Sequence, residues 1–277
     1  MQKQPLVSII ISTLNREEYI KRAIESALGQ TYKNIEIIIM DGGSTDRTKE
    51  VILPYLADLR VQYIYKKDKT PAEGRNNGIR ISKGKYIAIL DSDDAWCNQK
   101  KLEKQVKFLE EHPEYIVTGG GLITINEANQ ETSRRLNPES DEEIKKNMLF
   151  DCLFSHSTVV YRKNAWEKVG GYNEDPDVSE DWDLWLRMGK LGKFYNFPEY
   201  FVCLLSGEQN RSIYIDRQIL KANIKLRKKY RDDYPNSLKA ILLSEIRYFY
   251  SLLPLSFRRF LSPLASRIRK IIFNSPL

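Results

Sequence analysis

The stretch YIAILDSDD, residues 86–94, joins five consecutive apolar residues directly to four polar ones, three of which are carboxylates. A short apolar run bounded by polar residues predicts a strand buried on both faces, as in a parallel sheet. In an open α/β sheet, ligands bind outside the carboxyl ends of the strands. The stretch therefore predicts a central strand, Tyr86–Leu90, with a ligand-binding loop at its end.

The same arrangement occurs twice earlier in the chain. Leu6–Ser12 (LVSIIIS) leads into Thr13 and Asn15, and Ile35–Met40 (IEIIIM) leads into Asp41. Three neighbouring strands would thus direct polar side chains into one crevice. Taken singly, each cluster is also compatible with turn or helix-cap chemistry, because Asn, Asp, Ser and Gly are common in both.

Segments with helical periodicity alternate with these strands, which predicts an α/β fold with a mostly parallel sheet and right-handed crossovers. The expected helices are Glu17–Leu28, Arg47–Tyr55, Ala72–Ile81 and Lys100–Glu111, and Val61–Tyr65 is a further expected strand. The pattern changes after Ile116–Ile125. There we expect a loop over Asn126–Pro138, helices over Asp141–Phe150 and Glu180–Lys190, a strand over Thr158–Tyr161, and only helices after Tyr214.

The loop Asp91-Ser92-Asp93-Asp94 carries three carboxylates that would repel one another and raise each other's pKa. A divalent cation would remove that cost. Hard oxygen ligands select Mg²⁺ or Mn²⁺, and Mg²⁺ usually takes one or two carboxylates together with substrate phosphates. The loop therefore predicts a metal shared with a diphosphate, with a solvated acidic turn as the alternative.

Two further segments carry candidate site residues. In Gly74-Arg75-Asn76-Asn77-Gly78, Arg75 is suited to bind a phosphate in bidentate fashion, although the glycines also fit tight packing alone. In Ser179–Trp185 (SEDWDLW), Asp181 is the candidate general base for an incoming hydroxyl, while Glu180 and Asp183 cap or position. The candidates for acceptor or diphosphate contact are His156, Glu180 and Trp182.

Composition excludes several other classes of protein. The 277 residues are 42% hydrophobic and 29% charged, which fits a globular chain of one large domain with an appendage. The three cysteines form no CxxC pair, so we expect neither a disulfide framework nor a zinc cluster, and a reducing cytosol fits. The first apolar run, Leu6–Ile11, is too short for a secretory signal, and no run reaches the ~18 apolar residues of a membrane span.

Charge is unevenly distributed. The net charge is +7, but the 15 basic and 4 acidic residues of 211–277 give +11, so residues 1–210 carry −4. In the basic part, Phe257–Ile272 has apolar residues at helical spacing, which predicts either an interfacial membrane helix or a helix packed on the body. The segment Leu238–Leu253 is apolar on more than one face and fits contact with the body, a membrane or a second subunit.

Taken in order, these motifs resemble the family 2 glycosyltransferases with the GT-A fold. The resemblance covers roughly residues 5–205. The matching pieces are VSIIISTLNR (7–16), DGGSTDRT (41–48), GRNNGI (74–79), LDSDD (90–94), GGYNED (170–175) and SEDWDLWLR (179–187). It implies a GT-A domain over residues 1–210, with a helical basic extension over 211–277.

The resemblance also implies an activity and roles for particular residues. The activity is inverting transfer of a sugar from a nucleoside-diphosphate sugar, in the first place a UDP-sugar, to a hydroxyl of a saccharide or lipid-linked acceptor. Thr13 and Asn15 would line the nucleoside pocket, Asp41 would bind the base, and Arg75 would reach the base or a phosphate. Asp91 would contact the ribose of the donor, and Ser92 would also bind the donor. Asp93 would ligate Mn²⁺ or Mg²⁺, and Asp181 would be the base that activates the acceptor.

The sequence departs from the family pattern in two places. Ser12 and Leu14 stand where the first motif usually has Pro and Tyr, and residues 205–211 lack the histidine that many members carry there.

Two competing hypotheses remain at this point. A sugar-phosphate nucleotidyltransferase would need a Gly-rich basic loop after the first strand, and Thr13–Arg16 offers none. A nucleic-acid-binding protein would use the basic tail but would leave both acidic motifs unexplained, and the acidic body would repel phosphates. We therefore expect a cytoplasmic enzyme that does not bind nucleic acid, either free, peripheral on the membrane, or assembled as a homo-oligomer.

Overall fold

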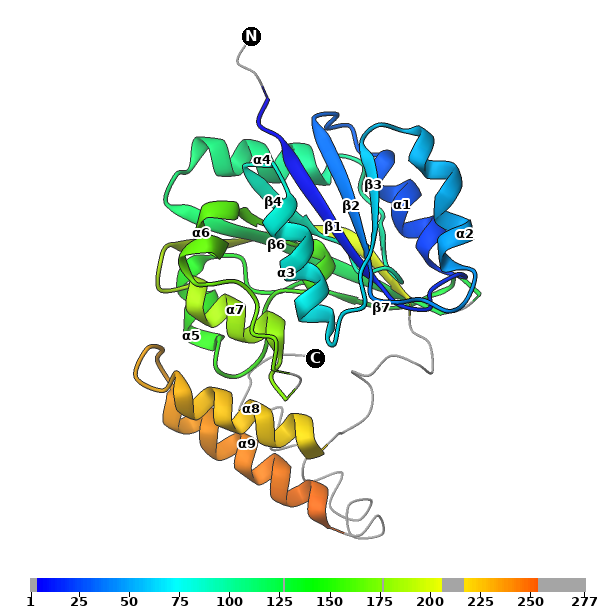
Figure 1. The fold of residues 1–277 in the computed structure, drawn as a ribbon. Coiled ribbons are helices and arrows are strands. Elements are labelled where there is room, and N and C mark those ends of the chain that lie inside the picture. The colour runs from blue at the N-terminus through cyan, green and yellow to red at the C-terminus, as the bar shows by residue number, and fades with distance from the viewer. Residues whose placement is uncertain (1–3, 127, 176, 206–216, 254–277) are drawn as a thin grey trace.

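The fold is taken from a computed structural model of the chain, which describes residues 4–126, 128–175, 177–205 and 217–253. Figure 1 shows a twisted central sheet with helices on both faces and a helical hairpin beside it. The amphipathic segment expected over residues 257–272 lies outside the described residues.

The sheet has nine strands in the order β3-β2-β1-β4-β8-β6-β9-β5, with β7 paired to β6. Strands β1 to β4 are mutually parallel, β8 runs antiparallel to both β4 and β6, and β6 and β9 are parallel. The strands are β1 Val7–Thr13, β2 Ile35–Asp41, β3 Val61–Tyr65, β4 Tyr86–Ile89, β5 Ala95–Trp96, β6 Tyr115–Ile125, β7 Glu131–Arg135, β8 Val160–Arg162 and β9 Lys193–Leu205.

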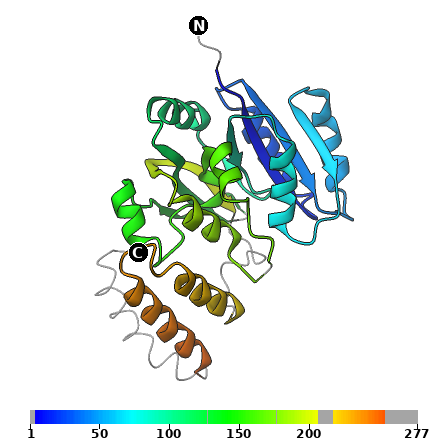
Figure 2. The ribbon, with the colours of Figure 1, turned by 60° about the vertical axis from the view of Figure 1, so that its left-hand side comes forward.

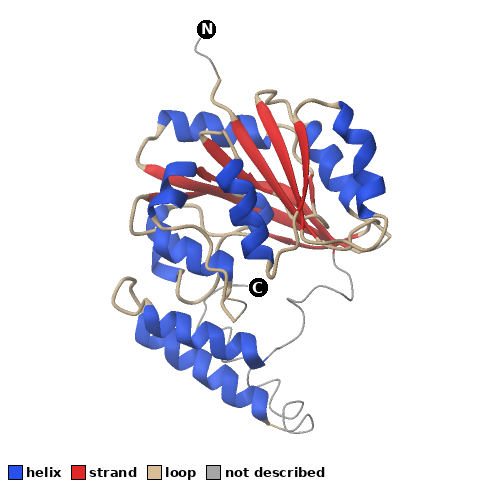
Figure 3. Ribbon diagram, in the orientation of Figure 1, coloured by secondary structure: helices blue, strands red, loops and turns tan. Residues whose placement is uncertain are grey.

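Helices cover the two faces of the sheet as separate layers (Figure 3). On one face, apolar residues of α1 and α4 pack against alternate residues of β1 and β2. On the other face, apolar residues of α3, α5, α6 and α7 pack against the residues in between. The helices are α1 Ile20–Leu28, α2 Thr48–Ile52, α3 Pro71–Ile81, α4 Lys101–Glu111, α5 Asp141–Asn147, α6 Lys163–Lys168, α7 Glu180–Met188, α8 Arg217–Lys229 and α9 Ser237–Leu252, with 3-10 turns η1 Leu53–Ala57 and η2 His156–Thr158.

The link between β4 and β5 requires the sheet to curl. Four strand spacings separate these two strands in the sheet order, about 19 Å in a flat sheet. The five-residue link is not fully extended, because the Asp94 N–H donates to the Asp91 carbonyl at 3.0 Å. The sheet therefore bends so that β5, paired with β9, returns to the end of β4. This curl places the acidic loop at the carboxyl edge.

Two glycines bring α3 close to the sheet. A Cβ on Gly78 would lie 3.0 Å from Met40 and 3.1 Å from Ile10, and one on Gly74 would lie 2.9 Å from the Ser12 Oγ. Glycine at both positions lets α3 lie against the ends of β1 and β2. Because Arg75 lies between them, the same packing buries its side chain at the sheet edge.

The expected loop over Asn126–Pro138 is wrong, because Glu131–Arg135 forms the edge strand β7. Its side chains are mostly exposed on both faces, so it lacks the apolar alternation that marks a half-buried strand. The expected helix Arg47–Tyr55 ends early, at Ile52, and continues as the 3-10 turn η1 around Pro54.

Helices α8 and α9 form a hairpin below the α/β body (Figures 1 and 2). Its inner face joins the core through Leu226, Tyr230, Tyr234 and Ala240, which are packed with residues of α7. Among the residues that the structure describes, no helix combines the length and apolarity needed to cross a membrane.

Lys101 provides a stability test of the α4 layer. Its side chain is fully buried at the helix N-terminus, its ammonium lacks a hydrogen-bond partner among the described residues, and it lies 4.2 Å from the Trp96 ring centroid. Burial holds its pKa well below the usual value. Lys101→Met keeps the volume and removes this cost, so we expect the free energy of unfolding at pH 7 to rise by about 1–3 kcal/mol.

Urea unfolding of Lys101→Met measures this change, and Lys100→Met, at an exposed neighbouring position, is the matched control. Because the folded pKa is lowered, wild type should gain stability as pH rises toward the unfolded pKa of about 10.4, and Lys101→Met should lack that part of the slope. A variant less stable than wild type at pH 7 would contradict this account of Lys101.

Candidate active site

The site is organised by one buried guanidinium. Arg75, on α3, donates from Nη2 to Asp91 Oδ1 at 2.8 Å and from Nη1 to Glu180 Oε1 at 2.9 Å. Asp91 follows strand β4, and Glu180 is the first residue of helix α7, so the two partners come from elements far apart in the sequence. The Arg75 side chain is only 9% exposed. Ion pairs at this depth join the acidic loop directly to the start of α7.

His156 completes the Asp91 side of this cluster. Its Nδ1 lies 3.9 Å from Asp91 Oδ1, and its Nε2 lies 2.8 Å from the Tyr172 hydroxyl. Burial, followed by the neighbouring Arg75 charge, lowers the pKa of His156 to about 4, so it is neutral at pH 7. Burial alone would raise the pKa of Asp91, but the charge of Arg75 and its hydrogen bond hold it below its ordinary value. Asp91 is therefore ionised and already paired.

The other two carboxylates of the loop differ sharply. Asp94 is buried against the Ser157 hydroxyl, and burial together with Asp91 raises its pKa well above the usual range. Asp93 keeps 30% of its side chain exposed and lies 3.6 Å from Arg16. Burial and the Asp91 charge raise the pKa of Asp93 as well. Asp91 is equally exposed, at 30%, but it is paired with Arg75 at 2.8 Å, so Asp93 is the exposed carboxylate of the loop that is incompletely neutralised.

This chemistry fits a divalent cation held partly by a substrate. Within the described ranges, no group of three or more His, Cys, Asp and Glu side chains converges as a metal cage. A Mg²⁺-type site needs only one or two carboxylates when phosphate oxygens and waters complete the shell. Asp93 supplies such a carboxylate, and a cation beside it would relieve the repulsion from Asp91.

Asp181 lies in the same electrostatic cluster, next to Glu180. Its Oδ1 accepts the Trp182 backbone N–H at 2.7 Å, and its Oδ2 lies 3.7 Å from the Cys152 sulfur. Burial, followed by the charge of Glu180, raises the pKa of Asp181 to about 6. A carboxylate with this pKa is mostly ionised at pH 7 and more basic than an ordinary aspartate, as a general base requires.

The ends of β1 and β2 form the other half of the edge. Thr13 is buried, and its hydroxyl lacks a hydrogen-bond partner among the described residues. Asn15, with φ of 52°, accepts the Thr45 N–H at 2.8 Å and so holds the loop after β2. Ser92 is also buried. The predicted donor residues therefore lie at one edge, but they are not equally accessible.

Three of the predicted site residues are engaged by protein groups in the structure. Asp41 is fully buried, and it accepts the Gly43 and Ser44 N–H groups and the Tyr63 hydroxyl. Both arms of Arg75 are paired, with Asp91 and Glu180. Trp182 is 4% exposed, and its indole donates to the Met148 carbonyl. Their roles toward a base, a phosphate or an acceptor stay predictions.

Several residues of the site were not identified from the sequence. Ser157 accepts the Asp91 N–H at 3.0 Å, and its carbonyl accepts the Trp96 indole at 2.8 Å. Tyr172 lies 6.0 Å from the Arg75 guanidinium and holds His156. A signal existed for Tyr172, which belongs to the GGYNED segment, but a lone serine such as Ser157 offers none.

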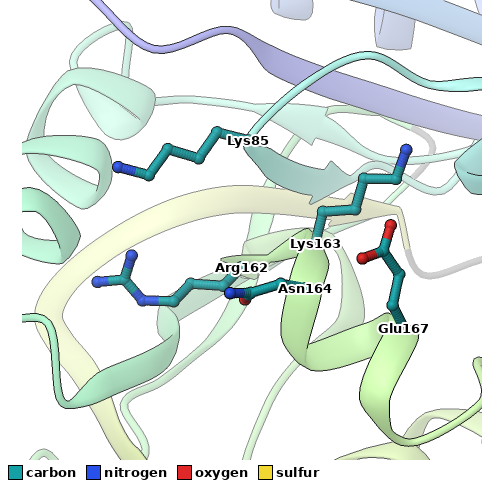
Figure 4. A pocket seen from close by; sticks show the side chains of 5 residues that line it. All are labelled: Lys85, Arg162, Lys163, Asn164 and Glu167. Carbon is teal, nitrogen blue, oxygen red and sulfur yellow. The ribbon is translucent and has the colours of Figure 1, made fainter.

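A hollow of about 230 Å³ lies away from this site, beside the start of β4 and the end of β8. Figure 4 shows Lys85 and Arg162 extending to one side of it, and Lys163 and Glu167 to the other. Its cations already have protein partners: Lys85 pairs with Glu110, Arg162 binds the Tyr115 carbonyl, and Lys163 binds the Ser82 carbonyl. These three cations are therefore already paired with protein groups.

Comparison with known proteins decides the family. The profile described as Glycosyl transferase family 2 matches residues 8–170. The chain belongs to glycosyltransferase family 2. This glycosyltransferase is 36% identical over 205 residues to the putative glycosyltransferase EpsE of Bacillus subtilis, covering 72% of each chain. It is 32% identical over 234 residues to an uncharacterized glycosyltransferase of Haemophilus influenzae, covering 79% of this chain and 71% of that one.

Solved structures share the fold of this glycosyltransferase. S. aureus TarS 1–349 in complex with UDP-GlcNAc superposes with a TM-score of 0.72 at 17% identity, over 90% of this chain and 76% of that one. The mannosyltransferase PcManGT of Pyrobaculum calidifontis, in complex with GDP-Man and Mn²⁺, gives a TM-score of 0.65 at 17% identity, over 89% and 70%. The GT-A fold is confirmed, and the nucleotidyltransferase and nucleic-acid-binding hypotheses are set aside.

The Arg75 ion pairs can be tested by stability. Arg75→Met leaves Asp91 and Glu180 without their shared partner, and removing one member of a buried ion pair costs about 3–5 kcal/mol. We expect a loss of that size in chemical denaturation at pH 7, and a smaller loss for Glu180→Gln, which leaves the Asp91 pair intact. Arg80→Met, five residues further along at an exposed position, is the control and should change stability by less than about 0.5 kcal/mol.

Proposed function

We propose that this glycosyltransferase moves a sugar from a nucleoside-diphosphate sugar to a hydroxyl acceptor in one inverting displacement. The observation that carries the proposal is the Asp91–Arg75–Glu180 bridge, because it joins the donor-side loop to the helix that carries Asp181. Asp91 acts electrostatically on both Asp93 and Asp181, which puts the candidate metal ligand and the candidate base in one charge cluster.

In this mechanism, Asp181 accepts the proton of the acceptor hydroxyl as its oxygen attacks the anomeric carbon from the face opposite the leaving diphosphate. The Trp182 N–H and the Cys152 thiol orient the carboxylate, leaving lone pairs for the incoming proton. Holding both reactants at one edge replaces a bimolecular encounter with a positioned one. His156 is neutral at pH 7 and adds no charge to this cluster.

Asp93 is the residue we assign to the divalent cation, Mn²⁺ or Mg²⁺. When bound, such a cation neutralises charge on the departing nucleoside diphosphate. Thr13, Asn15, Ser92 and the main chain after β2 line the nucleoside side, and we propose a UDP-sugar as the first donor to test. We propose a saccharide or lipid-linked saccharide as acceptor, as in polysaccharide, lipopolysaccharide or glycolipid assembly.

Two isosteric variants separate binding from chemistry. Asp181→Asn should reduce transfer by at least about 100-fold, the lower range for loss of a positioned proton-transfer group. Asp93→Asn should also abolish transfer, because the cation that neutralises the leaving diphosphate loses its carboxylate. Asp93→Asn should also weaken Mn²⁺-dependent UDP binding in calorimetry, whereas Asp181→Asn should leave that affinity unchanged. Equal Mn²⁺-dependent UDP affinity in wild type and Asp93→Asn would contradict the metal assignment.

The pH dependence tests Asp181 independently. Because burial raises its pKa to about 6, the reactive carboxylate is lost as pH falls through that value. We expect kcat/KM for the acceptor to be level near pH 7–8 and to fall about tenfold per pH unit below pH 6. An acid limb near pH 4 would instead indicate an ordinary, exposed carboxylate as the base.

We further propose that the α8–α9 hairpin binds the cytoplasmic face of an anionic membrane, within the extension 211–277. Five apolar residues on α9 remain between 44% and 81% exposed. They are Leu238, Leu242, Ile246, Phe249 and Leu252. Their spacing of three or four residues places them on one side of the helix.

Basic residues flank this apolar stripe. Lys221 and Lys225 line the groove between the two helices together with Phe249, and residues 211–277 carry a net charge of +11. Apolar residues beside cations match the boundary between acyl chains and anionic headgroups. The side of the hairpin that faces the body is bonded to helix α7, because Lys229 and Tyr230 both donate hydrogen bonds to Asp183. Membrane contact would therefore bring the Asp181 side of the site near a lipid-linked acceptor.

Vesicle binding tests this surface. Leu242→Gln/Ile246→Gln should weaken binding to phosphatidylglycerol vesicles at least about tenfold, because two exposed apolar side chains lose their lipid contact. Binding to phosphatidylcholine vesicles should be weak for every variant. Leu59→Gln, at a 98% exposed apolar residue before β3, is the matched control and should bind like wild type.

Two other results would reject the membrane proposal. A fall in thermal stability with unchanged vesicle binding would indicate that the stripe is covered within the chain. A shift of wild type to a larger species in ultracentrifugation, abolished in the double variant, would indicate a second copy as the occupant.

A further inference from the structure

Two cysteines meet on neighbouring strands at the end of the curled sheet. Strand β5 pairs with β9 in the register Ala95↔Cys203 and Trp96↔Val202, and the Cys97 N–H donates to the Phe201 carbonyl at 3.0 Å. Cys97 and Cys203 are therefore diagonal neighbours on one face of the antiparallel pair. Both are free thiols, Cys97 is exposed, and the Cys97 thiol lies 3.9 Å from the Tyr200 carbonyl of β9.

The surroundings of this pair favour thiolate chemistry on one partner. The neighbouring Cys97 thiol is the main cause that lowers the pKa of Cys203 to about 7, against the effect of burial, and the positive charge of Arg22 contributes. The same pairing raises the pKa of Cys97. A thiolate nucleophile beside an exposed second thiol is the arrangement of an attacking and a resolving cysteine.

The pair is connected to the acidic loop by short contacts. Arg22, the cation that acts on Cys203, donates to the Asp93 main-chain carbonyl at 3.1 Å. Trp96, next to Cys97, donates its backbone N–H to Ser26 Oγ and its indole to the Ser157 carbonyl. A change in the position of Cys97 therefore acts on a segment that begins at the proposed metal ligand.

We propose that Cys97 and Cys203 form a reversible intramolecular disulfide, and that its closure shifts the 94–97 segment beside the donor loop. Diagonal neighbours on antiparallel strands lie about 7–8 Å apart, whereas a disulfide needs Cα atoms within about 4.4–6.8 Å. Closure must therefore draw the end of β5 along β9. A bond that displaces backbone in this way is labile to reduction, as regulatory disulfides are.

The oxidant we assign is a small-molecule disulfide of the glutathione class. The Cys203 thiolate attacks one sulfur of oxidised glutathione, breaking its S–S bond and releasing one glutathione thiolate. The Cys97 thiol then loses its proton and its sulfur attacks Cys203 in the mixed disulfide, releasing the second glutathione. The protein loses two electrons and two protons, and the glutathione disulfide gains them as two thiols.

Thiol counting on the full chain, equilibrated in glutathione buffers of increasing oxidised fraction, tests the chemistry. Wild type should fall from three free thiols to one, with a Cys97–Cys203 cross-linked peptide in mass spectrometry, and dithiothreitol should restore three. Cys152→Ser should form the same cross-link. Cys97→Ser should retain glutathione on Cys203 without resolving it, and Cys203→Ser should react slowly.

Hydrogen exchange in peptides covering residues 90–97 tests whether the disulfide shifts the 94–97 segment, and it does not depend on an activity assay. We expect exchange at residues 94–97 to change on oxidation of wild type and to stay unchanged in Cys97→Ser under the same buffer. A stable glutathione adduct in wild type, or cross-links only between chains, would overturn the disulfide. A cross-link with unchanged exchange at 94–97 would overturn its coupling to the loop.

Discussion

The double ion pair of Arg75 is the interaction on which the site depends. A buried guanidinium is tolerated only with full compensation, and here Asp91 and Glu180 provide it from two elements far apart in sequence. Arg75 in turn holds the pKa of Asp91 below its ordinary value. The helix carrying Asp181 and the loop carrying Asp93 are consequently fixed relative to each other before any substrate arrives, as preorganised catalysis requires.

Contacts elsewhere in the fold hold Arg75 and helix α7 in position. Gly74 and Gly78 let α3 approach the strands closely enough to bury Arg75. On the far side, Asp183 binds Arg187, Lys229 and Tyr230, so the same helix that presents Asp181 is tied to the C-terminal hairpin. One side of α7 thus carries the proposed base, and the other is attached to the hairpin. This division explains why three acidic residues within four positions have three different surroundings.

Local patterns were sufficient for the first half of the fold. Continuous β-branched runs predicted β1, β2 and β4, and apolar periodicity predicted α1, α4 and α7, because these elements bury regular faces. Strand β9 was not predicted: its partners β6 and β5 are distant in sequence, and Pro198 interrupts its pattern. Within the site, residue type indicated Asp91, Arg75 and Glu180, but their pairing depends on packing that no single segment encodes.

Two predicted site residues have contacts that the sequence did not indicate. The Asp41 carboxylate accepts the Ser44 N–H, and the Trp182 indole donates to the Met148 carbonyl. Trp182 lies one helical turn before Trp185 and Leu186, so helix phase directs it to the core. Spacing along the chain identified Asp181 as distinct from Asp183, whereas only the structure shows that Asp183 is held by cations of α7 and α8.

The short link between β4 and β5 has a consequence for how substrates enter. Both of its ends are strands of a single sheet. Ser157 forms hydrogen bonds with Asp91, Asp94 and Trp96, and so holds the link at three positions. A substrate therefore meets a loop whose shape is already set by the sheet and by Ser157. Any shift of residues 94–97 has to break or carry along the hydrogen bonds of Trp96 to Ser26 and Ser157.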